Sequence, residues 1–475
     1  AYFVAVTNTA FWKALSATGV LEGSRGLALV PSLAVAIMGF HAAVLAAFLN
    51  RWIAKPALTI LMVLTLAVGV AASVSTLTIL HMMSGDPIPH KSDRLFVPIF
   101  DVQPAEGYVP GTPSDEQQVT YTDAMNLLKS GQGVRRTALY GIAPSVEPLR
   151  KDIGAFTAPG IAPTRDFFAM FEVPFLHGQP WSEADDARGA SVAILGRQVA
   201  EKLFGDASPV GQRLNVMGQP FTIVGVVDDW EPQPRYYKLV GGDFFGVREE
   251  IFIPLATAVR LEASRNGGMS CYSRPEPGFQ GIMRSECTWL QFWFETASGA
   301  ERGALHDYLN GYATEQRKLG RMRRGTPAEL YDVKQWMEHE KVVGKDNKLS
   351  VWLAFGFLAL CLVNTIGLLL AKFSVRASEV GIRRALGASK REIFRQFLTE
   401  SAVIGLAGGL LGLLLAFGAL ALIGMQNREA AAVARMDLTM LAFTFVLSVL
   451  AAVLAGLFPT WRACQVTPAI QLKSQ

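Results

Sequence analysis

Seven cationic side chains lie close together in the last third of the chain, and their spacing suits recognition. They are Lys372, Arg376, Arg383, Arg384, Lys390, Arg391 and Arg395. Ile382, Leu386, Ile393 and Phe397 recur among them at roughly helical spacing, which predicts a helix with one apolar and one cationic face. Such a helix can lie on anionic lipid or dock into a groove on a partner protein.

Two details of this segment favour a protein partner over lipid. Glu379 and Glu392 interrupt the basic face, which a lipid-binding helix would tend to avoid. Gly387, Ala388 and Ser389 together predict a bend, which a continuous interfacial helix would not need. We therefore interpret the segment as a docking element.

Catalytic chemistry is not visible elsewhere in the sequence. There is no G-x-x-x-x-G-K-[ST] phosphate loop, so the chain does not bind ATP by that motif. The six histidines are scattered and form no zinc-binding pattern. The acidic run of Glu183, Asp185 and Asp186 is interpreted as a solvated helix start. We predict no catalytic residue, no metal site and no cofactor in this chain.

The elements that must position the basic segment are membrane spans. The chain has 475 residues, of which 51% are hydrophobic and 18% charged, which is too apolar for an ordinary soluble protein. About 20 apolar residues cross a bilayer as a helix. Six stretches approach this length, at residues 2–20, 27–49, 56–80, 349–372, 401–424 and 438–458. Flanking Lys and Arg place the basic segment and both chain ends in the cytoplasm, and the long stretch after residue 82 outside.

The fold class is therefore a polytopic α-helical membrane protein with a large α+β extracytoplasmic domain. We expect two subdomains there. The patterns predict helices at 119–129 and 301–318, a strand and helix at 189–203, a hairpin at 213–227 and a strand at 250–255. Gly218 and Pro220 are expected at the hairpin turn. A helix from residue 336 is expected to run directly into the following span.

Two smaller patterns concern covalent and helix-packing contacts. Cys271 and Cys287 both lie in the extracytoplasmic stretch, where a disulfide is favoured, although two buried free thiols remain an alternative. In the fifth apolar stretch the glycines form two small-xxx-small pairs, which permit close helix approach. These glycines are Gly405, Gly408, Gly409 and Gly412. They suit either packing within one chain or a dimer seam.

The segment EVGIRRALGASKREIFRQFLTESAVIGLAGGLLG, which begins at Glu379, closely resembles the signature of the ABC permeases typified by MacB, LolC, LolE and FtsX. The first permease span with SDRLF, the stretch ARGASVAILGRQVAEKLFGDASPVGQRLNVMGQPFTIVGVV and the tail FPTWRACQVTPAIQLK agree with it. The resemblance covers about residues 56–473. Residues 1–55 depart from the family and weakly resemble the membrane anchor of lipid A phosphoethanolamine transferases. They are either a native addition or a fused segment.

The resemblance implies a domain order. A two-span hairpin at 1–55 precedes the first permease span at 56–82 and a MacB-like periplasmic domain at 83–335. A stalk helix and the second span follow at 336–375, then a cytoplasmic coupling helix at 376–399. The third and fourth spans occupy 400–458 and a cytoplasmic tail 459–475.

The resemblance also implies partners and a mechanism. A separate ATPase subunit, holding ATP and Mg, would move the coupling helix and drive export or extraction of a drug, peptide, lipoprotein or lipid. The expected coupling residues are Glu379, Ile382, Arg383, Arg384, Lys390 and Arg391. A second permease copy or paralogue, a periplasmic adaptor with an outer-membrane channel, and the lipid of a bacterial inner membrane are further expected partners; nucleic acid is not.

Two alternative functions stay open at this point. One is an FtsX-like regulator of a cell-envelope enzyme, in which the extracytoplasmic domain moves a partner and nothing is transported. The other, suggested only by residues 1–55, is a membrane enzyme of the phosphoethanolamine transferase kind, which would need a nucleophile and metal ligands outside the membrane.

Overall fold

The computed structural model describes residues 56–112, 114–148, 152–240, 244–343 and 345–426, with residues 446, 450, 453 and 456–461 of a later helix. The expected hairpin at 1–55 and most of the expected fourth permease span and tail therefore lie outside the described residues. The chain packs as two compact units. Of the described residues, the membrane unit contains 56–74 and 354–416, and the second unit contains 75–353 and 417–426.

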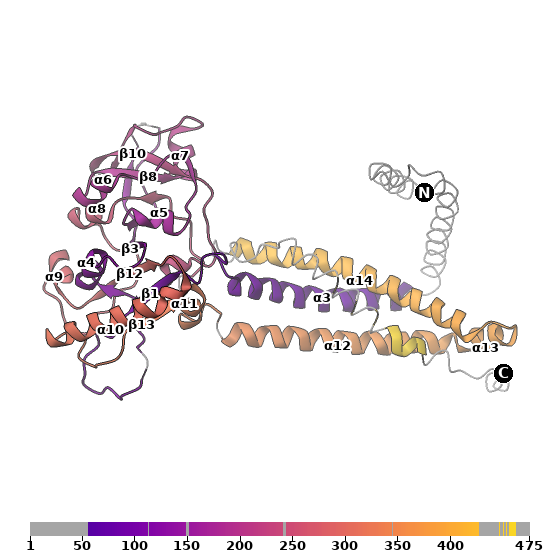
Figure 1. The fold of residues 1–475 in the computed structure, drawn as a ribbon. Helices are drawn as coiled ribbons and strands as arrows, with labels where there is room; N and C mark the ends of the chain where they lie inside the picture. Colours follow the sequence, from indigo (N-terminus) through magenta and orange to yellow (C-terminus); the bar gives the residue numbers. More distant parts are fainter. Residues whose placement is uncertain are drawn as a thin grey trace, which may run out of the picture. The chain divides into compact units, whose positions relative to one another are not determined.

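Three described helices are long and apolar enough to cross a membrane. They are α3 (Pro56–Ser84), α12 (Lys345–Val375) and α14 (Lys390–Gln426). Figure 1 shows each of them as one extended helix. Each of the three helices is continuous. Its backbone polar groups therefore form hydrogen bonds within the helix, as a bilayer requires.

Glycines allow α3 to approach its neighbours closely in the membrane unit. A Cβ at Gly69 would lie 2.9 Å from the Cβ of Cys361 on α12. A Cβ at Gly412 on α14 would lie 2.9 Å from the carbonyl oxygen of Ala67, and one at Gly408 would lie 2.9 Å from Leu66. The pair Gly408 and Gly412 therefore serves packing within the chain.

The membrane unit also buries the other two glycines of the predicted stripe and one serine hydroxyl. Gly405 and Gly409 are buried as well. Ser73 on α3 donates a hydrogen bond of 3.0 Å to the carbonyl oxygen of Ala354 on α12. A buried hydroxyl that bonds across two helices adds a directional contact to a seam otherwise held by small residues.

The extracytoplasmic unit is built on one mixed sheet with 13 strands in its described part. The strands are β1 (Leu95–Ile99), β2 (Val119–Thr120), β3 (Arg135–Ile142), β4 (Ser145–Glu147), β5 (Phe156–Thr157), β6 (Gly160–Pro163), β7 (Phe175–Gly178), β8 (Val192–Gly196), β9 (Arg213–Val216), β10 (Gln219–Val227), β11 (Ile251–Phe252), β12 (Thr288–Glu295) and β13 (Glu329–Asp332). The spatial order is β13-β1-β12-β3-β6-β11-β8-β10-β9-β4-β5, with β2 beside β12 and β7 beside β10.

Helices cover both faces of this sheet. They are α4 (Tyr121–Lys129), α5 (Asp166–Met170), α6 (Glu183–Arg188), α7 (Arg197–Phe204), α8 (Leu255–Arg260), α9 (Phe279–Arg284), α10 (Arg302–Lys318) and α11 (Val333–His339). Phe96 of β1 packs in one core with α4 and α10, while its neighbours Leu95 and Val97 pack in a second core with α5 and α11. Strands buried on both faces need no polar alternation, and all eight residues of β12 are buried. Figure 1 shows two groups of strands and helices, which the hydrogen-bonded sheet joins.

Several predicted elements are present with shifted details. The expected helix at 119–129 begins at Tyr121, and the expected strand and helix at 189–203 are β8 and α7. The hairpin is β9 and β10, but its turn consists of Met217 and Gly218, with φ of 53° and 70°. A two-residue hairpin turn needs positive φ at both positions. The placement of Pro220 at the turn was wrong, because it lies within β10.

The predicted continuous helix from residue 336 into the second permease span is also wrong. α11 ends at His339, and Lys341 adopts a left-handed φ of 55°. The backbone N–H of Lys341 donates to Glu338 and that of Val342 donates to Met337, which is the pattern of a Schellman motif. The buried side chains of Met337 and Val342 accompany it. α12 then starts afresh at Lys345.

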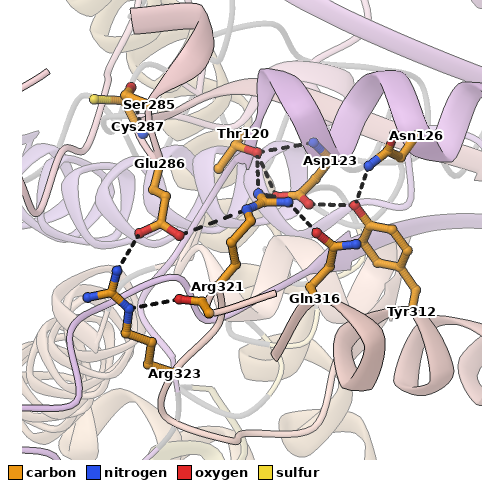
Figure 2. Close-up of polar contacts among 11 residues, drawn as sticks. Thr120, Asp123, Asn126, Ser285, Glu286, Cys287, Tyr312, Gln316, Arg321 and Arg323 are labelled. Atoms are coloured by element: carbon orange, nitrogen blue, oxygen red, sulfur yellow. Dashed lines mark hydrogen bonds and ion pairs between the residues drawn. The ribbon is translucent and has the colours of Figure 1, made fainter. Parts of the chain in front are cut away.

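A polar network joins α4, the end of α10 and the disulfide segment (Figure 2). Asp123 is fully buried and accepts hydrogen bonds of 2.6 Å from Arg321 Nη2, Tyr312 Oη and Thr120 Oγ1. Glu286 lies 3.9 Å from Arg321 Nε and precedes Cys287, which forms a disulfide with Cys271. A buried carboxylate with a paired cation and further donors is costly to disrupt, so this network fixes three segments together.

Candidate docking site

The predicted docking segment is a bent pair of helices at one end of the membrane unit. α13 (Ala377–Ala385) has Leu386 as its C-cap, and Gly387 follows with a left-handed φ of 99°. The backbone N–H of Ala388 donates to Arg383 at 3.0 Å and that of Gly387 donates to Arg384 at 3.2 Å. Glycine suits this position because residues with a Cβ are strained there. The predicted bend is thus formed, and the expected coupling helix at 376–399 divides into α13 and the first turns of α14.

The two acidic residues of the segment have roles within the chain. Ser389 Oγ accepts from the backbone N–H of Glu392 at 3.2 Å, and the Glu392 carboxylate accepts from the backbone N–H of Ser389 at 2.9 Å. This is a capping box at the start of α14. Glu379 pairs with Arg383 at 2.5 Å. Glu379 and Glu392 therefore have structural roles within the chain. Their presence no longer argues for a protein partner over lipid.

The four apolar residues do not form one docking face. The side chains of Ile382 and Leu386 are 53% and 83% exposed. Ile393 and Phe397 are each 3% exposed, because they pack in a core with Met62 of α3 and with α12. The rings of Phe397 and Phe373 lie 4.3 Å apart between their centroids. The bend at Gly387 separates the two pairs, so only Ile382 and Leu386 are available to a partner.

A charged cluster beneath the spans was missed by the sequence reasoning. Glu400 Oε1 accepts from Lys372 Nζ at 2.8 Å, and its Oε2 lies 3.1 Å from Arg376 Nη1. Lys372 also donates to Thr59 Oγ1 on α3 at 3.1 Å. The cluster links α3, α12 and α14, and the Lys372 and Glu400 side chains are each only 10% exposed. The sequence signal for this cluster was Glu400, which lies at the start of an apolar stretch. A charged side chain in such a place is rare without a partner.

Three of the remaining basic residues face outward, whereas Arg384 is half-buried. Lys390, Arg391 and Arg395 are exposed and, within the described part of the chain, form no ion pair. Arg383 donates to Gln396 Oε1 at 3.0 Å, so it also ties α13 to α14. The docking surface is thus defined by Ile382, Arg383, Leu386, Lys390 and Arg391. It can bind a partner that offers an apolar pocket with acidic surroundings.

The acidic run of the extracytoplasmic unit opens a helix, as interpreted. Ser182 caps α6 by accepting from the backbone N–H of Asp185. Asp186 is half-buried and accepts a hydrogen bond from Trp181 Nε1 at 2.8 Å. Within the described ranges no three His, Cys, Asp or Glu side chains gather as a metal site would require.

Comparison with known proteins decides the family. A family model described as the MacB-like periplasmic core domain matches residues 59–311, and one described as the FtsX-like permease C-terminal matches residues 351–468. The chain belongs to the MacB/FtsX family of ABC permeases. It is accordingly a membrane protein with an extracytoplasmic domain, and the docking surface lies in its FtsX-like part.

Relatives of this ABC permease are export proteins by name. It is 29% identical over 314 residues to the pyoverdine export ATP-binding/permease protein PvdT of Pseudomonas syringae pv. syringae (strain B728a), covering 65% of this chain and 42% of that protein. It is 27% identical over 245 residues to the macrolide export ATP-binding/permease protein MacB of Rhodopirellula baltica, covering 50% of this chain and 34% of that protein. The chain thus spans less than half the length of these relatives.

A solved structure also resembles the extracytoplasmic unit. It is the periplasmic region of MacB from Actinobacillus actinomycetemcomitans, with a TM-score of 0.32 and 14% identity, covering 52% of this chain and 92% of that one.

Proposed function

We propose that the docking surface seats an ABC ATPase and that this permease couples ATP hydrolysis there to movement of its extracytoplasmic domain. The observation that carries the proposal is the contrast between the two apolar pairs. Ile382 and Leu386 are free for a partner, while Ile393 and Phe397 anchor the same element to α3 and α12. A force applied at the surface therefore acts on helices that cross the membrane.

The ATPase, with its ATP and Mg, is proposed to be a separate subunit. The relatives PvdT and MacB are named as ATP-binding and permease proteins together. The residues of the docking surface bind and position the ATPase; none of them holds a nucleotide. An ATPase that binds better to one state of the permease shifts the permease toward that state.

The transported material is proposed to be a small molecule exported from a bacterial inner membrane. Support comes from the names of the relatives, which export pyoverdine and macrolides. A second permease copy or paralogue, and a periplasmic adaptor with an outer-membrane channel, complete the proposed assembly. The expected multi-pass topology, with the docking surface in the cytoplasm, belongs to the same proposal.

Charge reversal at Arg383 and Arg384 together tests the coupling. In proteoliposomes that contain the permease and its ATPase, we expect Arg383→Glu with Arg384→Glu to abolish stimulation of ATP hydrolysis while the protein still inserts in membranes. Arg284→Glu, on the exposed surface of α9, is the matched control and should leave stimulation unchanged. Full stimulation in the double variant would contradict the proposal.

A further inference from the structure

A small cavity opens in the extracytoplasmic unit between β3, β12 and the loop at residues 265–268. Its volume is about 60 Å³, which holds roughly four water-sized positions. Tyr140 and Trp289 are among its lining residues, and both are 1% exposed. Lys238 and Arg265 contribute the two charged groups in its lining. None of the described residues that line it carries a carboxylate.

Lys238 is held at this cavity by a buried charge network. Its Nζ donates to Glu249 Oε1 at 3.0 Å, and the same carboxylate oxygen accepts from Arg235 Nη1 at 3.1 Å. Glu249 is thus shared between two cations, and its own side chain is only 2% exposed. An ammonium has three donors, so Lys238 retains capacity for a ligand.

Gly141 makes room for this arrangement. A Cβ there would lie 2.1 Å from the carbonyl oxygen of Asn266 and 3.2 Å from Lys238 Nζ. Any side chain at this position would push the loop away and fill the space beside the ammonium. The cavity therefore depends on a glycine at the point where β3 meets the loop.

Arg265 is positioned over the cavity without an anionic partner. Its guanidinium lies 5.6 Å from the centre of the Trp289 ring, so the aromatic face holds it in place. No ion pair or side-chain hydrogen bond of Arg265 is formed with the residues that the structure describes. Burial lowers the pKa of Arg265 from its usual value, a cost that an anion beside the guanidinium would offset.

Two buried polar atoms in the lining side chains also have no hydrogen-bond partner among the residues that the structure describes. They are Trp289 Nε1, which only donates, and Gln291 Oε1. Tyr140 is different, because its hydroxyl donates to the carbonyl oxygen of Ala263 at 3.3 Å and burial raises its pKa, so it stays neutral. Leaving a buried polar atom unsatisfied costs about 1–3 kcal/mol. A carboxylate only accepts hydrogen bonds, so of these two atoms it would satisfy the Trp289 Nε1 donor.

We propose that this cavity binds a carboxylate, with Arg265 and Lys238 as its charged ligands and Trp289 as an indole donor. A planar carboxylate suits a guanidinium, which presents paired donors in a fixed geometry. The carboxylate is that of a small organic acid or of a peptide C-terminus. This site lies in the extracytoplasmic unit and does not depend on the proposed ATPase docking.

Fluorine NMR of the full chain in nanodiscs, labelled with 5-fluorotryptophan, tests the site. The signal of Trp289 among the nine tryptophans is identified by its loss in Trp289→Phe. We expect N-acetylglycine to shift this signal, and neutral N-acetylglycinamide to have no effect. Equal shifts from acid and amide, inorganic phosphate that binds more tightly than the acid, or shifts confined to other tryptophans would overturn the proposal.

Variants identify the charged ligand. We expect Arg265→Gln to weaken N-acetylglycine binding about tenfold or more, which corresponds to at least about 1.4 kcal/mol. Arg284→Gln, an exposed arginine of the same unit, should bind as the native protein does. Arg265→Lys keeps the charge and should show intermediate affinity; unchanged affinity in folded Arg265→Gln would contradict the assignment.

Two further probes separate the sources of the carboxylate. If acetate binds as tightly as N-acetylglycylglycine, the site takes small organic acids. If the dipeptide binds at least about tenfold more tightly, it takes a peptide C-terminus. Binding of neither probe to the native protein overturns the proposal.

Discussion

Glu400 is the residue on which the charge balance of the membrane unit depends. It is the acceptor for both Lys372 and Arg376, and Lys372 reaches α3 from the same position. Removing one partner of a buried pair leaves the other charges without compensation, which is worse than never having the pair. The three-helix base is therefore more sensitive to loss of Glu400 than to loss of any exposed charge nearby.

Replacement of Glu400 should destabilise the membrane unit. We expect Glu400→Gln to lower the free energy of unfolding by about 2–4 kcal/mol, because Lys372 and Arg376 lose their acceptor. Glu379→Gln breaks an exposed pair and should cost less than about 1 kcal/mol. Thermal unfolding of the purified proteins compares the two; equal midpoints would show that the cluster has no stabilising role.

Glu340 makes the stability of the extracytoplasmic unit depend on pH. Burial raises the pKa of this carboxyl to about 8, although Lys341 partly opposes the shift. A raised folded-state pKa means that the stabilising protonated form is complete below the ordinary carboxyl pKa and is lost as pH rises through about 8. Burial lowers the pKa of neighbouring His339 below its usual value, so this imidazole is neutral in the upper part of that pH range.

The melting temperature of the extracytoplasmic unit should fall as pH rises from about 6.5 to about 8 and level off above that pH. We expect Glu340→Gln to remove most of this fall, because the amide does not ionise. The measurement is thermal unfolding of both proteins in matched buffers. The same slope in native protein and variant would assign the pH dependence to other groups.

At the scale of elements, close helix approach in the membrane unit rests on particular glycines of α14. Gly412 meets the backbone of α3 at Ala67, whereas no atom of the described residues lies within 4 Å of a Cβ at Gly418. Both positions gain similar helix propensity from a larger residue. A comparison of the two therefore isolates the packing of α14 against α3.

We expect Gly412→Leu to lower the stability of the membrane unit by about 1–3 kcal/mol through overpacking. Gly418→Leu should be neutral or slightly stabilising. Thermal unfolding and the amount of folded protein in membranes are the readouts. Equal behaviour of the two variants would contradict the packing of Gly412 against α3.

Helical periodicity could predict the docking element but not which of its apolar residues meets a partner. Ile382, Leu386, Ile393 and Phe397 look equivalent in the sequence, and the separation depends on the turn at Gly387 and on contacts with α3 and α12. Glu400 was missed for the same reason, since its cationic partners lie 24 and 28 residues away, at Arg376 and Lys372. Long-range pairing of this kind is a tertiary property.

At the scale of the whole molecule, apolar length and a specific sequence signature were sufficient to predict the class. Three described spans, a mixed sheet covered by helices and the two family matches agree with a membrane permease that has an extracytoplasmic domain. The stalk was mispredicted because a Schellman motif at Lys341, a residue that rarely adopts positive φ, has no strong sequence signal. α12 is consequently a separate helix, which begins at Lys345 after that break.

The most direct test of the account is photo-crosslinking from Leu386, which is the more exposed of the two apolar residues of the docking surface. A photoreactive amino acid is placed at Leu386 or, as the matched control, at buried Phe397, and cells are irradiated while the transporter is intact. We predict that position 386 yields an adduct whose tryptic peptides include a G-x-x-x-x-G-K-[ST] phosphate loop, and that position 397 yields only contacts within the chain. Adducts with lipid alone at position 386 would contradict the claim that this surface seats an ATPase.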